Sequence, residues 1–217
     1  MSAELSVVNL GRVPYSEGVA LQDRVRAARQ AGSIPDTLLL LEHDPVYTKG
    51  RRSDATDLPM GEDWYRMQGI EVAATTRGGR VTYHGPGQLV GYPIVDLNPD
   101  RRDVHRYVRD LEEVLIRTAR DYGIAADRVE GLTGVWVGRE KLAAIGVRIA
   151  RWVTSHGFAL NVNANLDYFS LIVPCGIADR GITSLSRLVG RPVELDETAE
   201  RVAGHFANVF DFSSLAT

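Results

Sequence analysis

The chain has 217 residues, of which 44% are apolar and 24% are charged, a composition typical of a globular protein with a substantial core. Its formal net charge of −3 excludes wholesale nucleic-acid binding, because domains with that function are strongly basic. No apolar run reaches the length of a membrane span, and the first residues lack the basic and apolar regions of a signal peptide. We therefore expect a cytoplasmic protein with no membrane partner.

The first part of the chain predicts two strands and a helix. Residues 5–9 are typical of a short strand, and Ser16 is expected to cap a helix that ends near Gly32. The continuous apolar run 37–42 predicts a strand buried on both faces. Residues 45–67 are predicted to be irregular.

The middle of the chain predicts short strands followed by the clearest helix. Residues 70–74 are typical of a strand, and residues 75–97 interleave β-type pieces with glycines. A helix is expected to begin at Asp103, because apolar residues then recur every three or four positions, and Gly123 is expected to stop it.

The last part predicts a β-hairpin over residues 133–150 that turns at Gly138, a strand over 158–162, and a helix that begins near Asp196. Most of the strands have no helix between them. The sequence therefore predicts an α+β fold with a mixed, mainly antiparallel sheet and flanking helices, in a single domain over residues 1–217.

Cys175 is the only cysteine, so an internal disulfide and a site with paired cysteine ligands for zinc are both excluded. Pro174 and Gly176 flank it with one stiff and one permissive backbone position, which suits a tight turn. The remaining interpretations are an inert buried thiol and a nucleophile.

The segment 77–93 contains five glycines, which allow the backbone to approach a ligand closely. It matches neither the P-loop nor the dinucleotide-binding pattern. A substrate-enclosing loop and a plain surface hairpin both remain open. His84, in this segment, could act as a base or as a hydrogen-bond donor that holds the loop.

Lys141 is expected at the start of the second hairpin strand, on the same face as Ala143, Ile145 and Val147. Desolvation on an apolar face would lower its pKa and make the neutral amine accessible. The alternative is a stem that extends to water from the strand end. A thiolate at neutral pH needs a neighbouring cation or base, so the residues alone leave a Cys–Lys and a Cys–His pair as candidates.

Five segments together resemble the lipoyl (octanoyl) transferases, which move an octanoyl group onto lipoyl domains. They are HDPVYTKG at 43–50, RGGRVTYHGPGQLVGYP at 77–93, KLAAIG at 141–146, TSHGFALNV at 154–162 and PCGI at 174–177. They follow the order of the family, and the resemblance spans about four fifths of the chain. It implies the α+β fold of the lipoate and biotin protein ligases. Leu142 replaces the usual isoleucine, a change that leaves the chemistry untouched.

The resemblance also implies roles for individual residues. Cys175 matches the acyl-thioester nucleophile, and Lys141 matches the lysine that lowers the pKa of that thiol. Three stretches match the lining of the acyl pocket. Their residues are Arg77, Gly78, Gly79, Arg80, Val81, Thr82, Tyr83, His84, Ala144, Ile145, Gly146, Gly157, Phe158 and Ala159.

The implied reaction needs no cofactor, because the octanoyl donor is already a thioester on the phosphopantetheine arm of acyl carrier protein. The implied acceptors are lipoyl domains of 2-oxo acid dehydrogenases and the glycine cleavage H protein. Carrier proteins are acidic, so Lys49, Arg51 and Arg52 are a candidate docking patch.

Three other functions remain open on the sequence. An ATP-dependent lipoate or biotin ligase of the same fold would form an adenylate and would not need Cys175. A binding module for lipoyl domains or acyl carriers would bind without turnover. A cysteine hydrolase that pairs Cys175 with His84 or His156 would release free octanoate.

Overall fold

The computed structural model describes residues 4–173 and 180–216, and Cys175 therefore lies outside the described residues. The larger sheet contains β1 (Glu4–Val13), β2 (Asp36–His43), β6 (Gln88–Ile94), β7 (Asp127–Val129), β8 (Leu132–Val137), β9 (Glu140–Ala150), β10 (Val153–Asn161), β11 (Gly181–Ile182) and β12 (Ser214–Ala216). The smaller sheet contains β3 (Val46–Lys49), β4 (Glu71–Ala74) and β5 (Val81–His84). The helices are α1 (Tyr15–Gln30), the 3₁₀ turn η1 (Ala55–Asp57), α2 (Glu62–Met67), α3 (Val104–Asp121), α4 (Asp167–Ser170), α5 (Leu185–Val189) and α6 (Leu195–Phe210).

The strands of the larger sheet lie in the order β12-β1-β2-β6-β10-β9-β8-β7, and β11 pairs with β9. The pairs β1–β12, β1–β2 and β11–β9 are parallel, and the others in this sheet are antiparallel. The prediction of an α+β fold with a mixed, mainly antiparallel sheet is therefore confirmed.

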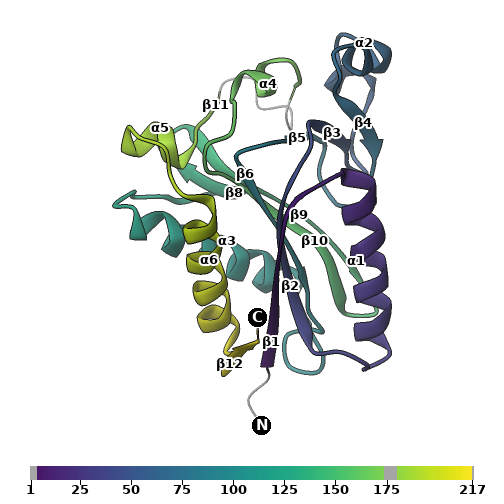
Figure 1. The fold of residues 1–217 in the computed structure, drawn as a ribbon, viewed down its shortest axis with the longest axis vertical. Coiled ribbons are helices and arrows are strands. Elements are labelled where there is room, and N and C mark those ends of the chain that lie inside the picture. The colour runs from purple at the N-terminus through teal and green to yellow at the C-terminus, as the bar shows by residue number, and fades with distance from the viewer. Residues whose placement is uncertain (1–3, 174–179, 217) are drawn as a thin grey trace.

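Helices cover both faces of the larger sheet, with α1 on one side and α3 and α6 on the other (Figure 1). Alternation along β2 explains why both faces are buried. Leu38 and Leu40 pack in the core beneath α3 and α6, whereas Leu39 and Leu41 pack in the core beneath α1. The predicted strand with two buried faces is confirmed.

Several predicted boundaries are also confirmed. Asp103 caps α3, and its carboxylate accepts hydrogen bonds from the backbone N–H groups of His105 and Arg106. The hairpin formed by β8 and β9 lies where it was predicted, with its turn at Gly138. None of the described helices has the combination of length and apolar character that a membrane span needs.

Two predictions are wrong. The cap of α1 is Pro14 rather than Ser16, and it makes no side-chain hydrogen bond. The stretch 45–67 is not irregular, because it contains β3, η1 and α2. These short elements depend on aromatic packing with residues outside the stretch: Tyr47 and Tyr83 are fully buried with their ring centroids 5.5 Å apart. A pattern within the segment could not reveal that contact.

Candidate active site

A cavity of about 510 Å³ lies where the glycine-rich segment before β5 meets β9 and β10, and its volume is typical of small-molecule sites. Lys141 and all of the predicted pocket residues except Tyr83 line it. The predicted residues in the lining are Arg77, Gly78, Gly79, Arg80, Val81, Thr82, His84, Ala144, Ile145, Gly146, Gly157, Phe158 and Ala159. The fold therefore brings three separate sequence segments to one site.

Tyr83 faces away from this cavity. Its ring stacks on that of Tyr168 with centroids 4.6 Å apart and also lies 5.5 Å from the ring of Tyr47. The side chain is only 1% exposed and belongs to the aromatic core beside the smaller sheet. Tyr83 therefore supports the pocket wall from behind.

Arg77 holds the glycine-rich segment in place. Its guanidinium donates to the Thr48 carbonyl at 2.6 Å, to the Thr48 hydroxyl at 2.7 Å and to the Arg80 carbonyl at 2.9 Å. Glycine is needed at position 50, because a Cβ there would lie 2.8 Å from Arg77 Nη1 and would clash with the Gly79 carbonyl. The buried arginine therefore holds the glycine-rich segment against β3 through charge-assisted hydrogen bonds.

Lys141 lies near one end of β9, directly across the hairpin from Trp136. Its Nζ sits 4.7 Å from the centroid of the Trp136 ring, and the guanidinium carbon of Arg180 lies 5.3 Å from the same centroid. The Trp136 side chain is only 2% exposed and lines the cavity with both cations. The ring therefore holds two cations next to each other in the cavity wall through cation–π contacts.

The charged residues of the lining are all cationic, although the chain as a whole is acidic. Among the described residues that form the wall there is neither Asp nor Glu, and the cations are Arg51, Arg52, Arg77, Arg80, Lys141 and Arg180. Arg80 is neutralised by Asp54 at 2.7 Å and Asp57 at 2.6 Å. Arg51 and Arg52 are exposed. The cavity is therefore electropositive and attracts anionic groups.

The three residues of the candidate docking patch have different surroundings. Lys49 pairs with Glu62, and the hydrogen bond from its ammonium lowers the pKa of that carboxyl group. Arg51 and Arg52 both line the cavity.

The cavity also contains neutral histidines. Burial lowers the pKa of His84 to about 3 and that of His156 to about 4. His84 donates from Nδ1 to the Gln88 amide oxygen at 2.7 Å. Of the two roles left open for His84, the structure favours the hydrogen-bond donor, because groups with such low pKa values are weak bases at neutral pH.

A third histidine stiffens the wall behind His84. Burial lowers the pKa of His43, whose Nδ1 lies 2.8 Å from the Val13 carbonyl and therefore donates to it. Its Nε2 then accepts the hydroxyl of Tyr92 at 2.7 Å. The described residues hold no group of three or more His, Cys, Asp or Glu side chains that could bind a metal ion.

A family model described as the lipoyl protein ligase A/B catalytic domain matches residues 14–207 of the chain. The chain belongs to this family. An octanoyltransferase from Solibacter usitatus is 53% identical over 206 residues, which cover 95% of this chain and 93% of the relative. The resemblance seen in the sequence motifs is therefore confirmed.

Solved structures show the same fold for this lipoyl protein ligase A/B domain. A bipartite lipoate protein ligase from Thermoplasma acidophilum superposes with a TM-score of 0.75 at 18% identity, covering 100% of this chain and 88% of the other. A biotin protein ligase from Aquifex aeolicus gives 0.53 at 12% identity, covering 97% and 70%. Sequence identities this low support only the shared fold.

The sequence motifs missed several residues that shape the site of this lipoyl protein ligase A/B domain. Trp136 could have been found, because it lies close to the turn of the predicted hairpin that Lys141 follows, and the observed register pairs the two residues. Arg180 could not, because it reaches the Trp136 ring from a different part of the chain. Tyr15, from α1, also lines the cavity and stacks against His84 with ring centroids 6.4 Å apart.

Proposed function

We propose that the chain is an octanoyltransferase of lipoate biosynthesis, which moves an octanoyl group from acyl carrier protein to a specific lysine of lipoyl domains through a thioester on Cys175. The observation that carries the proposal is a cavity that is lined both by apolar side chains and by Lys141. Its apolar residues include Val81, Val90, Ala144, Ile145, Val147, Phe158, Ala159 and Phe169. Burial of about seven methylenes would contribute roughly 5–6 kcal/mol at ~0.8 kcal/mol each.

The first step is thioester exchange. The thiolate of Cys175 attacks the octanoyl carbonyl, and the carbon–sulfur bond to the phosphopantetheine arm breaks. Lys141 has taken the thiol proton and returns it to the departing thiolate of the arm. The site wall is compatible with this assignment, because Arg180, Gly181 and Ile182 follow the Cys175 segment and line the cavity beside Lys141.

The second step forms the amide. The neutral amine of the acceptor lysine attacks the octanoyl thioester, its extra proton passes to Lys141, and the carbon–sulfur bond to Cys175 breaks. The donor thioester is already activated, so neither ATP nor another cofactor takes part.

The charges of the cavity fit the proposed donor. The phosphopantetheine arm carries a phosphodiester and its carrier is acidic, and Arg51, Arg52 and Arg180 supply positive charge at the site. The proposed acceptors are lipoyl domains of 2-oxo acid dehydrogenases and the glycine cleavage H protein. The proposed place of action is the cytoplasm, where these partners occur.

Mass spectrometry of the protein mixed with octanoyl-acyl carrier protein tests the proposal. We expect an octanoyl adduct on the wild-type chain that Cys175→Ser lacks, and transfer of that octanoyl group to an added lipoyl domain without ATP. An unchanged adduct on the Ser variant would refute the thioester. Pyrophosphate release would favour a ligase, free octanoate a hydrolase, and binding without turnover a binding module.

Thiol alkylation tests the second residue of the pair. Lys141→Ala is expected to slow alkylation of Cys175 by iodoacetamide at pH 7 at least tenfold, because the thiolate loses its cation. Lys49 is the only other lysine in the chain, so Lys49→Ala is a matched control with an expected unchanged alkylation rate. Equal rates in both variants would remove Lys141 from its role.

A further inference from the structure

A continuous chain of buried polar groups runs from the glycine-rich segment to β11. His84 Nδ1 lies 2.7 Å from the Gln88 side-chain oxygen, and Gln88 Nε2 donates to Asn161 Oδ1 at 2.9 Å. Asn161 Nδ2 then donates to the Thr183 carbonyl at 3.0 Å. All four residues are at most 7% exposed.

The direction of every bond in this chain is fixed. Gln88 Nε2 has two hydrogens, which it donates to Asn161 and to the Tyr83 carbonyl at 3.2 Å. Its oxygen must therefore accept, so His84 donates from Nδ1 and stays in one neutral tautomer. Asn161 in turn must direct its amide nitrogen at Thr183. Reversing one amide would leave a buried donor facing a donor, so each link holds the next.

The last link lies beside Lys141. The N–H of Thr183 donates to the Lys141 carbonyl at 3.0 Å, while its own carbonyl accepts the Asn161 amide. Strand β11 pairs with β9 at only two positions, Gly181 with Glu140 and Ile182 with Lys141. So short a ladder gives little stability by itself. Asn161 therefore supplies a side-chain anchor that the ladder lacks.

We propose that Asn161 is a positioning residue for acyl transfer, which holds Thr183 and with it β11 against Lys141. The inference rests on the proposed function, in which Lys141 works with Cys175, because β11 follows the Cys175 segment directly in the chain. Gln88 acts one step further back, by fixing the orientation of the Asn161 amide. Neither side chain reacts with the acyl group.

The chain contains a close comparison for Asn161 two residues further on. Asn163 also clamps a distant backbone, since its Nδ2 donates to the Val193 carbonyl at 2.6 Å and its Oδ1 accepts from the Val193 N–H at 3.0 Å. Neither Asn163 nor Val193 lines the cavity. Asn163→Ala therefore removes the same kind of clamp without disturbing Lys141.

The experiment compares Asn161→Ala with Asn163→Ala in transfer from octanoyl-acyl carrier protein to a lipoyl domain. Asn161 is a polar residue of the cavity lining, and replacing it leaves the apolar lining residues in place. For Asn161→Ala we therefore expect kcat to fall at least tenfold with the donor KM changed less than twofold, because the apolar contacts to the acyl chain are kept while the reacting groups lose their alignment. Asn163→Ala should keep its kcat within twofold of the wild type. A kcat for Asn161→Ala within twofold of that of Asn163→Ala would overturn the proposal.

Hydrogen exchange tests the placement independently of activity. The amide of Thr183 should exchange at least tenfold faster in Asn161→Ala than in either the wild type or Asn163→Ala, and equal exchange would overturn the proposal. Gln88→Met covers the case in which Asn161→Ala fails to fold. This variant keeps the Asn161 side chain. Compared with Asn161→Ala, it should give a smaller rise in the exchange rate of the Thr183 amide and a smaller loss of kcat, whereas wild-type values of both would count against the proposal. A wild-type chain without transfer would instead refute the proposed function.

Discussion

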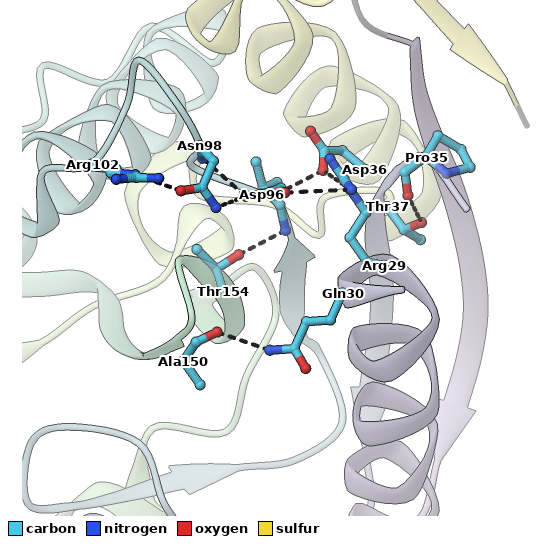
Figure 2. A network of polar contacts seen from close by, with 11 residues as sticks. Arg29, Gln30, Pro35, Asp36, Thr37, Asp96, Asn98, Arg102, Ala150 and Thr154 are labelled. Carbon is cyan, nitrogen blue, oxygen red and sulfur yellow. Dashed lines mark hydrogen bonds and ion pairs between the residues drawn. The ribbon is translucent and has the colours of Figure 1, made fainter. Parts of the chain in front are cut away.

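The two ends of β10 differ in the charged residues around them: one has cations paired with carboxylates, and the other has cations without a carboxylate among the described lining residues of the cavity. Near Thr154, the network in Figure 2 places Arg29 against two carboxylates, 2.6 Å from Asp36 and 3.6 Å from Asp96. Near Asn161, roughly 23 Å along the strand at about 3.3 Å per residue, the cavity contains cations with no carboxylate among its described lining residues.

This difference indicates that the network end serves stability, whereas the cavity end serves function. At the network end, Asp36 also accepts the Asp96 N–H at 2.9 Å, and the Thr154 hydroxyl bonds two backbone groups of the neighbouring strand region. Each buried charge there has a partner and fixes a strand end. At the cavity end, Lys141 and Arg180 both lie over one aromatic ring, and the described residues of the wall include no carboxylate. Like charges held together oppose folding, so their presence favours a role in binding anions.

The largest expected effect lies at the network end. Arg29→Met should lower the free energy of unfolding by about 3 kcal/mol, because it leaves the mostly buried Asp36 without its cation. The activity per folded molecule should not change. Urea unfolding at pH 7 measures the loss, with Arg24→Met, an exposed position on the same helix, as the control.

The corresponding change at the cavity should behave differently. Arg180→Met is expected to alter the free energy of unfolding by less than about 0.5 kcal/mol, since this residue contacts a ring rather than a buried acid. A loss as large as that of Arg29→Met would break the comparison between the two ends.

The next effect is the response to acid. Burial holds the pKa of His156 at about 4, below its unfolded value of 6.5, so between these pH values the unfolded chain binds a proton at His156 more readily than the folded one. The stability that depends on a neutral His156 is therefore complete above pH 6.5 and is lost as the pH falls toward 4. At pH 5 the loss amounts to about 2 kcal/mol at 1.36 kcal/mol per pH unit. Burial raises the pKa of Asp36 at the network end, so protonation of Asp36 favours the folded state as the pH falls, opposite to the effect of His156.

Unfolding measured at pH 7 and pH 5 tests this assignment. His156→Asn should lose about 2 kcal/mol less than the wild type between these values, and asparagine suits the positive φ of 53° at this position. His105→Asn, at an exposed site on α3, should keep the wild-type pH dependence. The same pH dependence in both variants would mean that His156 is protonated without cost.

The sequence predicted the parts of the fold that periodicity controls. The two-sided burial of β2, the Asp103 cap and the β8–β9 hairpin follow from local pattern and turn chemistry. The pocket lining was expected only through the resemblance, because nothing in a single segment indicates that Gly146 and Gly78 share a cavity. Tyr83 shows where the assignment of pocket residues from the resemblance fails, since a motif does not record which face of the sheet a strand residue lies on.

Contacts between distant residues could not be predicted. The Gln88–Asn161 bond joins positions 73 residues apart, and the side chains that meet are fixed only once β6 and β10 pair. The same holds for Arg77, which the resemblance places in the pocket lining and whose hydrogen bond to the Thr48 carbonyl appears only in the fold. Polar residues in a core take partners that the whole topology supplies, so their roles follow from the fold.

A smaller effect concerns the exposed cations of the cavity. Replacing Arg51 and Arg52 together by Gln should lower kcat/KM for the acyl carrier donor about tenfold at low salt, because two charges that attract the donor are lost. The difference from wild type should shrink as salt is added, since exposed charges are screened. The control replaces the exposed Arg24 and Arg120 by Gln, which changes the net charge equally away from the cavity. Equal losses in both double variants would mean that only net charge matters.

The smallest effect distinguishes the cavity wall from the surrounding scaffold. A Cβ on Gly146 would lie 3.1 Å from Arg77 Cδ and 3.2 Å from the Gly78 carbonyl oxygen, so Gly146→Ala fits with a shift of a few tenths of an ångström and fills part of the cavity. The preference for octanoyl over hexanoyl donors should fall about fourfold per displaced methylene, at ~0.8 kcal/mol each. Gly204→Ala on α6 meets nothing within 4 Å and should leave the preference unchanged. If Gly146→Ala leaves the preference unchanged too, the acyl chain occupies another part of the cavity.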